Sequence, residues 1–203
     1  MSITGLFLML FLLVHLTANL TSLVSAQLFV KTCHMMGSNP FILAMTPILA
    51  AGAGLHFLYA GLLTLHNLRA LGLNRYAAGN KNSGISWASK NMFLLGLVVF
   101  GGLALHLLHF WSKMQLADII GGVEVDPYEL LRYQFSQIHI VIIYVVWVVA
   151  LWLHLTHGFW SAFQTIGLSN KNWIKRLQIA ASIYATLVSV GFISIPIYFY
   201  CFL

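Results

Sequence analysis

The stretch MFLLGLVVFGGLALHLLHFWSKM, residues 92–114, decides the fold of this chain. From Met92 to Trp111 it contains no charged residue. About 20 such residues, rising about 1.5 Å each in an α-helix, cross a hydrocarbon core of about 30 Å. Two histidines, His106 and His109, interrupt this apolar run. Because an unsatisfied polar group in lipid is costly, we expect these imidazoles to have a partner or a function inside the protein.

The rest of the chain has the same apolar character. The composition is 60% hydrophobic and 7% charged, which leaves too little polar surface to cover a soluble domain. Strict alternation of apolar and polar residues is absent, so a membrane β-barrel is not expected. We therefore predict an all-α integral membrane protein in which residues 1–203 form a single domain. Its five transmembrane helices are predicted at about 3–26, 41–68, 92–114, 138–167 and 177–202.

The basic residues of the loops predict the orientation. The second and fourth loops contain no acidic residue and most of the Lys and Arg, namely Arg69, Arg75, Lys81, Lys90, Lys171, Lys175 and Arg176. The opposite face has three basic residues, Lys31, Lys113 and Arg132, and all the acids, Asp118, Glu124, Asp126 and Glu129. By the positive-inside rule, the second and fourth loops and the N-terminus face the cytoplasm and the C-terminus faces outward. No basic surface interleaved with aromatic residues indicates a nucleic-acid partner, whereas membrane lipid is an expected one.

Histidines at matched depths occur on four of the predicted helices. Counted from the cytoplasmic end of its helix, His15 lies at about 18 Å and His109 at about 24 Å, both in the outer half. Counted from the external end, His56 lies at about 22 Å and His154 at about 24 Å, both in the inner half. His106, at about 20 Å, competes with His109, because residues three apart share one helix face.

Two layers of paired imidazoles predict two haems. A porphyrin held between helices needs one histidine from each of two helices at equal height. The two irons would lie about 14 Å apart along the membrane normal. With both axial positions taken by protein there is no open site for oxygen or substrate, so this haem-binding helix bundle is predicted to transfer electrons.

Three other interpretations of the histidines remain open. A buried histidine often only packs and bonds to a neighbouring carbonyl or helix. A zinc site is less favoured, because no four ligands share one layer and no Cys or acid joins them. A proton relay in a haem-free transporter is possible in principle, although such relays usually contain Asp or Glu, and the predicted spans contain neither.

The histidine-containing segments resemble a known family. The segments FLLVHLTANL (11–20), GLHFLYAGLLTL (54–65), HLLHFWSKMQL (106–116) and LHLTHGFWSAFQTIGL (153–168) occur in this order on the first four spans. Together they resemble the di-haem cytochrome b membrane-anchor subunit of bacterial succinate:quinone oxidoreductases, complex II. Another two-haem cytochrome b anchor of a quinone-linked oxidoreductase is the nearest alternative, but those families place their ligands on different helices.

The resemblance assigns one iron ligand to each of the first four helices. It implies His56 and His154 for the proximal haem, on the cytoplasmic side, and His15 and His109 for the distal haem. The third-helix ligand in this family precedes an aliphatic or aromatic residue and then Trp, which matches the HFW of residues 109–111. The resemblance therefore favours His109 over His106.

The resemblance also implies partners and a reaction. A flavoprotein subunit oxidises succinate, and an iron–sulfur subunit on the cytoplasmic face passes electrons to the two haems b and on to membrane menaquinone. The chain would act in the bacterial cytoplasmic membrane in either direction, as part of a succinate dehydrogenase or fumarate reductase, and would not itself be catalytic for succinate. Candidate quinone contacts are Asn19, Ser22, Gln27 and His34, and candidate inner donors for haem carboxylates are Ser2, Thr4, Arg69 and Lys90.

Overall fold

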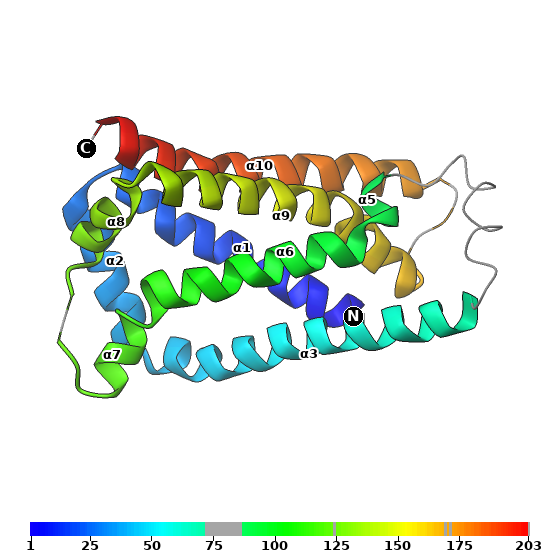
Figure 1. The fold of residues 1–203 in the computed structure, drawn as a ribbon, viewed down its shortest axis with the longest axis horizontal. Coiled ribbons are helices and arrows are strands. Elements are labelled where there is room, and N and C mark those ends of the chain that lie inside the picture. Colours follow the sequence, from blue (N-terminus) through cyan, green and yellow to red (C-terminus); the bar gives the residue numbers. More distant parts are fainter. Residues whose placement is uncertain (72–86, 124, 169, 171, 203) are drawn as a thin grey trace.

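In a computed structural model, the chain is a bundle of long antiparallel helices (Figure 1). The structure describes residues 1–71, 87–123, 125–168, 170 and 172–202. Four of the charged residues used above for orientation, Arg75, Lys81, Glu124 and Lys171, lie outside this range. Five of the described helices are long and apolar enough to cross a membrane, which confirms the five predicted spans and indicates a multi-pass membrane protein.

The observed helix bounds differ from the predicted ones by a few residues. In chain order the elements are α1 (Ser2–Leu20), η1 (Thr21–Leu23), α2 (Ala26–Ser38), α3 (Pro40–Leu71), α5 (Trp87–Lys90), α6 (Met92–His106), η3 (Leu107–Trp111), α7 (Gln115–Ile119), α8 (Pro127–Phe135), α9 (Ile138–Thr165) and α10 (Ile174–Phe202). The turn η3 is π-helical and continues α6, so the third span ends at Trp111.

Short helices cover the predicted external end of the bundle. His34, expected in a loop, lies in α2 instead, because Ser25 caps that helix by accepting a hydrogen bond from the Leu28 N–H at 3.1 Å. Helix α8 begins in the same way, with the Asp126 carboxylate accepting from the N–H groups of Tyr128 and Glu129 at 2.8 and 3.0 Å. Its apolar face is buried against α2, α9 and α10.

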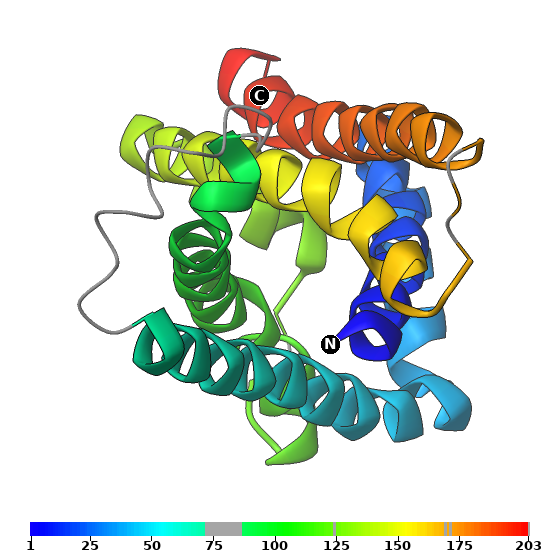
Figure 2. The same cartoon turned by 90° about the vertical axis from the view of Figure 1, so that its right-hand side faces the viewer.

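Four of the long helices form a ring around the bundle interior. Helix α1 contacts α3 and α9, and α6 contacts the same two, so that α1 lies opposite α6 and α3 lies opposite α9 (Figure 2). Helix α10 lies outside this ring, packed on α9 and α1 through the fully buried Ala181, Ala185 and Val188. Side chains of α1 can therefore meet those of α6 across one diagonal of the ring, and side chains of α3 can meet those of α9 across the other.

Helix α3 packs more loosely than the other spans. In the most apolar part of α3 no residue is buried inside the protein, whereas 39% of the residues in the corresponding part of α9 are buried. A hydrogen-bonded group at the external end connects α3 to α7: Gln115 accepts from the Trp111 indole N–H at 2.9 Å and donates to the Thr46 hydroxyl at 3.2 Å. Helix α3 thus contributes less to the buried core than the other spans.

Candidate haem-binding site

The inner pair of histidines meets across one diagonal of the ring. His56 on α3 and His154 on α9 have ring centroids 6.4 Å apart. The other two helices line the same layer, because Gly5 of α1 lies against the His56 ring and Gly96 of α6 lies against the His154 ring. The structure thus brings together the two residues that the sequence pairs by depth in the inner layer.

The outer pair meets across the other diagonal, but its second member is His106. The rings of His15 on α1 and His106 on α6 have centroids 5.7 Å apart. Aromatic side chains surround them: Phe11 stacks on His15 at 5.2 Å, and Trp147 lies 5.8 Å from His106. The two imidazoles of the outer layer therefore have aromatic side chains as close neighbours.

His109, which the resemblance favours as the partner of His15, lies elsewhere. Its ring stacks on Tyr144 at 5.9 Å, and its Nδ1 lies 3.3 Å from the Tyr144 hydroxyl. The π-helical turn explains this difference, because the Ser112 N–H bonds to the Leu107 carbonyl, five residues back, at 2.8 Å. A π turn rotates less per residue than an α-helix, so the angle between His106 and His109 changes: both rings contact Phe110 and Tyr144, and the His106 ring also contacts His15.

The two layers are separated along the bundle axis. On α1, Thr4 contacts the inner His56, and His15 of the outer pair lies 11 residues further on, which corresponds to about 16 Å. On α6, Gly96 lies at the inner layer and His106 at the outer one, which corresponds to about 15 Å. The two pairs of imidazoles are therefore about 15 Å apart along the bundle axis.

Trp147 fills space between the two layers. Its indole N–H donates to the Val99 carbonyl of α6 at 2.9 Å, and its ring lies directly on Gly102, where a Cβ atom would overlap it. Val99 and Gly102 lie on α6 between Gly96 and His106. A glycine at position 102 is thus required for the tryptophan to approach the α6 backbone.

Polar partners differ among the four paired histidines. The Thr4 hydroxyl lies 3.1 Å from Nδ1 of His56, and the Asn19 amide nitrogen lies 3.4 Å from Nε2 of His15. By contrast, Nδ1 of His154 is buried and has no hydrogen-bond partner within the described part of the chain. Nδ1 of His157 and the Ser189 hydroxyl are also buried without a partner in the described part of the chain, so this feature is not specific to the paired histidines.

The remaining histidines lie away from these pairs. His66 and His139 are exposed, and His157 contacts Trp160 with its ring centroid 4.9 Å away. Among the described residues, no three His, Cys, Asp or Glu side chains are grouped as a metal site would require. The histidines are therefore arranged two by two, which does not match the four-ligand geometry of structural zinc.

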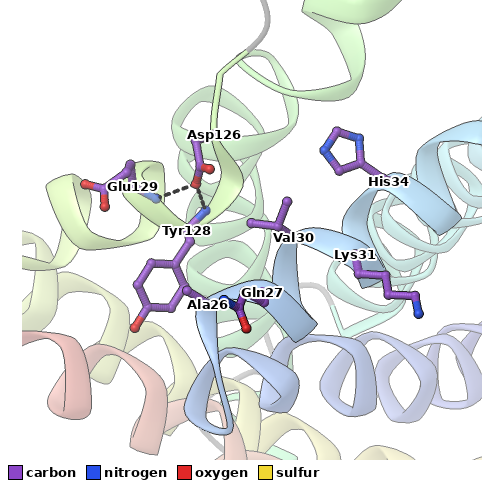
Figure 3. A pocket seen from close by; sticks show the side chains of 8 residues that line it. All are labelled: Ala26, Gln27, Val30, Lys31, His34, Asp126, Tyr128 and Glu129. Carbon is purple, nitrogen blue, oxygen red and sulfur yellow. Dashed lines mark hydrogen bonds between the residues drawn. The ribbon is translucent and has the colours of Figure 1, made fainter.

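The candidate quinone contacts separate into two places. Asn19 and Ser22 lie in the bundle near His15, where the buried Ser22 hydroxyl donates to the Asn19 carbonyl at 2.7 Å. Gln27 and His34 instead line an open cavity of about 450 Å³ between α2 and the start of α8 (Figure 3). The four residues do not form one site.

Two groups beside this cavity have perturbed acidity. Burial, and secondarily the Asp126 carboxylate, raise the pKa of the Cys33 thiol to about 11. Burial also raises the pKa of Tyr128 above its ordinary value, with Tyr198 contributing. Both groups are therefore neutral at physiological pH, and Cys33 has little of the thiolate character that a reactive cysteine needs.

Comparison with known proteins assigns no family to the chain. No protein-family model matches the chain, and no curated protein or solved structure is similar to it.

Proposed function

We propose that the chain is a di-haem cytochrome b membrane anchor that passes electrons between a cytoplasmic iron–sulfur subunit and menaquinone in a succinate:quinone oxidoreductase. The observation that carries the haem assignment is the presence of two histidine pairs on the two diagonals of one four-helix ring. The choice of complex II rests on the resemblance of the four histidine segments.

The spacing of the paired rings fits a metal held between them. A bond of about 2 Å from each imidazole nitrogen to one iron separates the two ring centroids by roughly 6 Å. The observed separations are 6.4 Å for His56 and His154 and 5.7 Å for His15 and His106. The position of both pairs on the diagonals of the ring supports the same assignment.

A haem held by two histidines supplies reversible one-electron transfer without an open coordination position. The side chains of the chain itself would hold and separate the two centres. His56 and His154 would hold the haem on the cytoplasmic side and His15 and His106 the haem on the outer side, with Trp147 packed on α6 between them. Succinate oxidation in this proposal belongs to the flavoprotein partner, because the chain supplies no flavin site or iron–sulfur cysteine pattern.

The test is haem quantitation on the full chain purified in detergent. We expect two haems b per chain by the pyridine haemochrome assay, and one each in His56→Ala and His154→Ala. His66→Ala is the matched control, because His66 lies on the same helix as His56 and is exposed. A haem-free wild type would contradict the cytochrome proposal and favour a transporter or a packing role for the histidines.

The complex II assignment has its own test. The chain purified from its native membrane should carry flavin-containing and iron–sulfur partners, and succinate should reduce its haems. Haem reduction by another donor but not by succinate would point to a different quinone-linked oxidoreductase.

A further inference from the structure

The Thr4 hydroxyl makes two polar contacts that together define its role. Its Oγ1 donates to the Met1 carbonyl at 2.9 Å, and the same oxygen lies 3.1 Å from Nδ1 of His56 on α3. A hydroxyl has a single hydrogen to donate and lone pairs with which to accept. When that hydrogen is donated to the Met1 carbonyl, the contact with His56 is a hydrogen bond only if the imidazole Nδ1–H is the donor.

This assignment determines the tautomer of His56. A neutral imidazole carries its proton on one nitrogen and a lone pair on the other. If Nδ1–H donates to Thr4, the lone pair is on Nε2. A metal binds an imidazole through the nitrogen that bears the lone pair, so Nε2 is the ligand atom that Thr4 makes available.

The other inner histidine has no comparable support. Nδ1 of His154 is buried and makes no hydrogen bond to any described residue. Thr17, 13 residues further along α1, donates its hydroxyl hydrogen to the Leu13 carbonyl at 2.8 Å. A helical threonine usually bonds only to a carbonyl of its own helix, as Thr17 does. Thr4 in addition contacts His56 and so connects α1 to α3.

We propose that Thr4 is a positioning residue for the inner haem: it accepts a hydrogen bond from Nδ1–H of His56 and thereby presents Nε2 to the iron. This inference rests on the proposed function. Such a hydrogen bond orients the ring and makes the ligand nitrogen more basic, and losing one typically lowers metal affinity by about 10–100-fold. A more basic ligand stabilises oxidised iron over reduced iron, so loss of the bond should raise the reduction potential of the inner haem.

The experiment compares three variants of the full chain. Thr4→Val replaces the hydroxyl with a methyl group of similar size, and Thr4→Ser keeps the hydroxyl. Thr17→Val is the matched control, because it removes a hydroxyl from the same helix that contacts no imidazole. The inner haem is identified in redox titrations as the component lost in His56→Ala.

Two readouts are measured on each variant. The first is the reduction potential and retention of the inner haem, with the outer haem as an internal reference. The second is the ¹⁵N spectrum of histidine-labelled protein from which haem has been removed, in which the His56 signals are those missing from His56→Ala. The haem-free protein is used because iron bound to Nε2 would by itself leave the proton on Nδ1.

We expect Nδ1 of His56 to be protonated in the wild type and in Thr4→Ser. In Thr4→Val, the inner haem should have a higher potential and about tenfold weaker retention, with the outer haem unchanged. A wild-type His56 protonated on Nε2 would overturn the inference, as would an equal effect of Thr4→Ser and Thr4→Val. A wild type that binds no haem contradicts the proposed function instead, and the tautomer measurement then still decides whether Thr4 positions His56.

Discussion

The imidazole of His106 lies with its ring centroid 5.7 Å from that of His15, whereas His109, three residues later, stacks on Tyr144. The π-helical turn between them changes the angle between two side chains that an uninterrupted α-helix would place on one face. Which histidine of this segment lies against His15 thus depends on a local change in helix geometry.

Replacement of His106 and of His109 should have different effects on haem content. His106→Ala removes the ring that faces His15, so the outer haem should be lost and one haem per chain retained. His109→Ala removes the contact with Tyr144 and should leave two haems. Pyridine haemochrome assays on the two purified variants measure this directly. Loss of haem in His109→Ala with full retention in His106→Ala would instead favour the ligand implied by the resemblance.

Gly102→Ala should destabilise the bundle, because the added Cβ would overlap the Trp147 ring. Overpacking of this kind costs about 1–3 kcal/mol, and displacement of the ring would also break its hydrogen bond to Val99. Gly101→Ala is the matched control, since a Cβ there would meet no atom within 4 Å. Thermal unfolding in detergent should show a lower midpoint for Gly102→Ala only. Equal midpoints in the two variants would mean that Trp147 does not lie on α6 in this way.

Labelling of Cys33 should depend strongly on pH. With its pKa raised to about 11, the thiol is almost entirely protonated near neutrality, and the maleimide reaction rate should rise about tenfold per pH unit between about pH 8 and 10. Because the Asp126 carboxylate disfavours the thiolate, Asp126→Asn should lower the pKa and accelerate labelling at pH 8. Asparagine can still cap α8, so the helix should remain. Glu129→Gln serves as the control, and a similar acceleration in that variant would contradict a specific effect of Asp126.

Single cysteines introduced at the two ends of the bundle should report opposite sides of the membrane. Val123 and Trp173 are both exposed, at 84% and 51%, and lie toward the acidic and the basic end, respectively. In a background lacking Cys33 and Cys201, Val123→Cys should react with an impermeant thiol reagent in intact cells. Trp173→Cys should react only after the cells are opened. The reverse pattern would invert the predicted orientation.

The five spans could be predicted from the sequence because long apolar runs have one stable form in lipid, a helix that satisfies its own backbone. Helices α2 and α8 were missed for the opposite reason. They are short and amphipathic, and their formation depends on the caps at Ser25 and Asp126 and on burial against the rest of the bundle.

Hydrophobicity and helical rise determined, without tertiary contacts, that the chain has five apolar helices and that its histidines occupy two depths, because both properties are read along a single helix axis. Which of His106 and His109 faces His15 was decided only by the tertiary structure. The pairs His56 with His154 and His15 with His106 depend on which helices are diagonal in the ring and on the rotation of each helix about its axis. The π turn changes that rotation within the third span, and a change of this kind cannot be read from hydrophobicity or from the number of residues between two histidines.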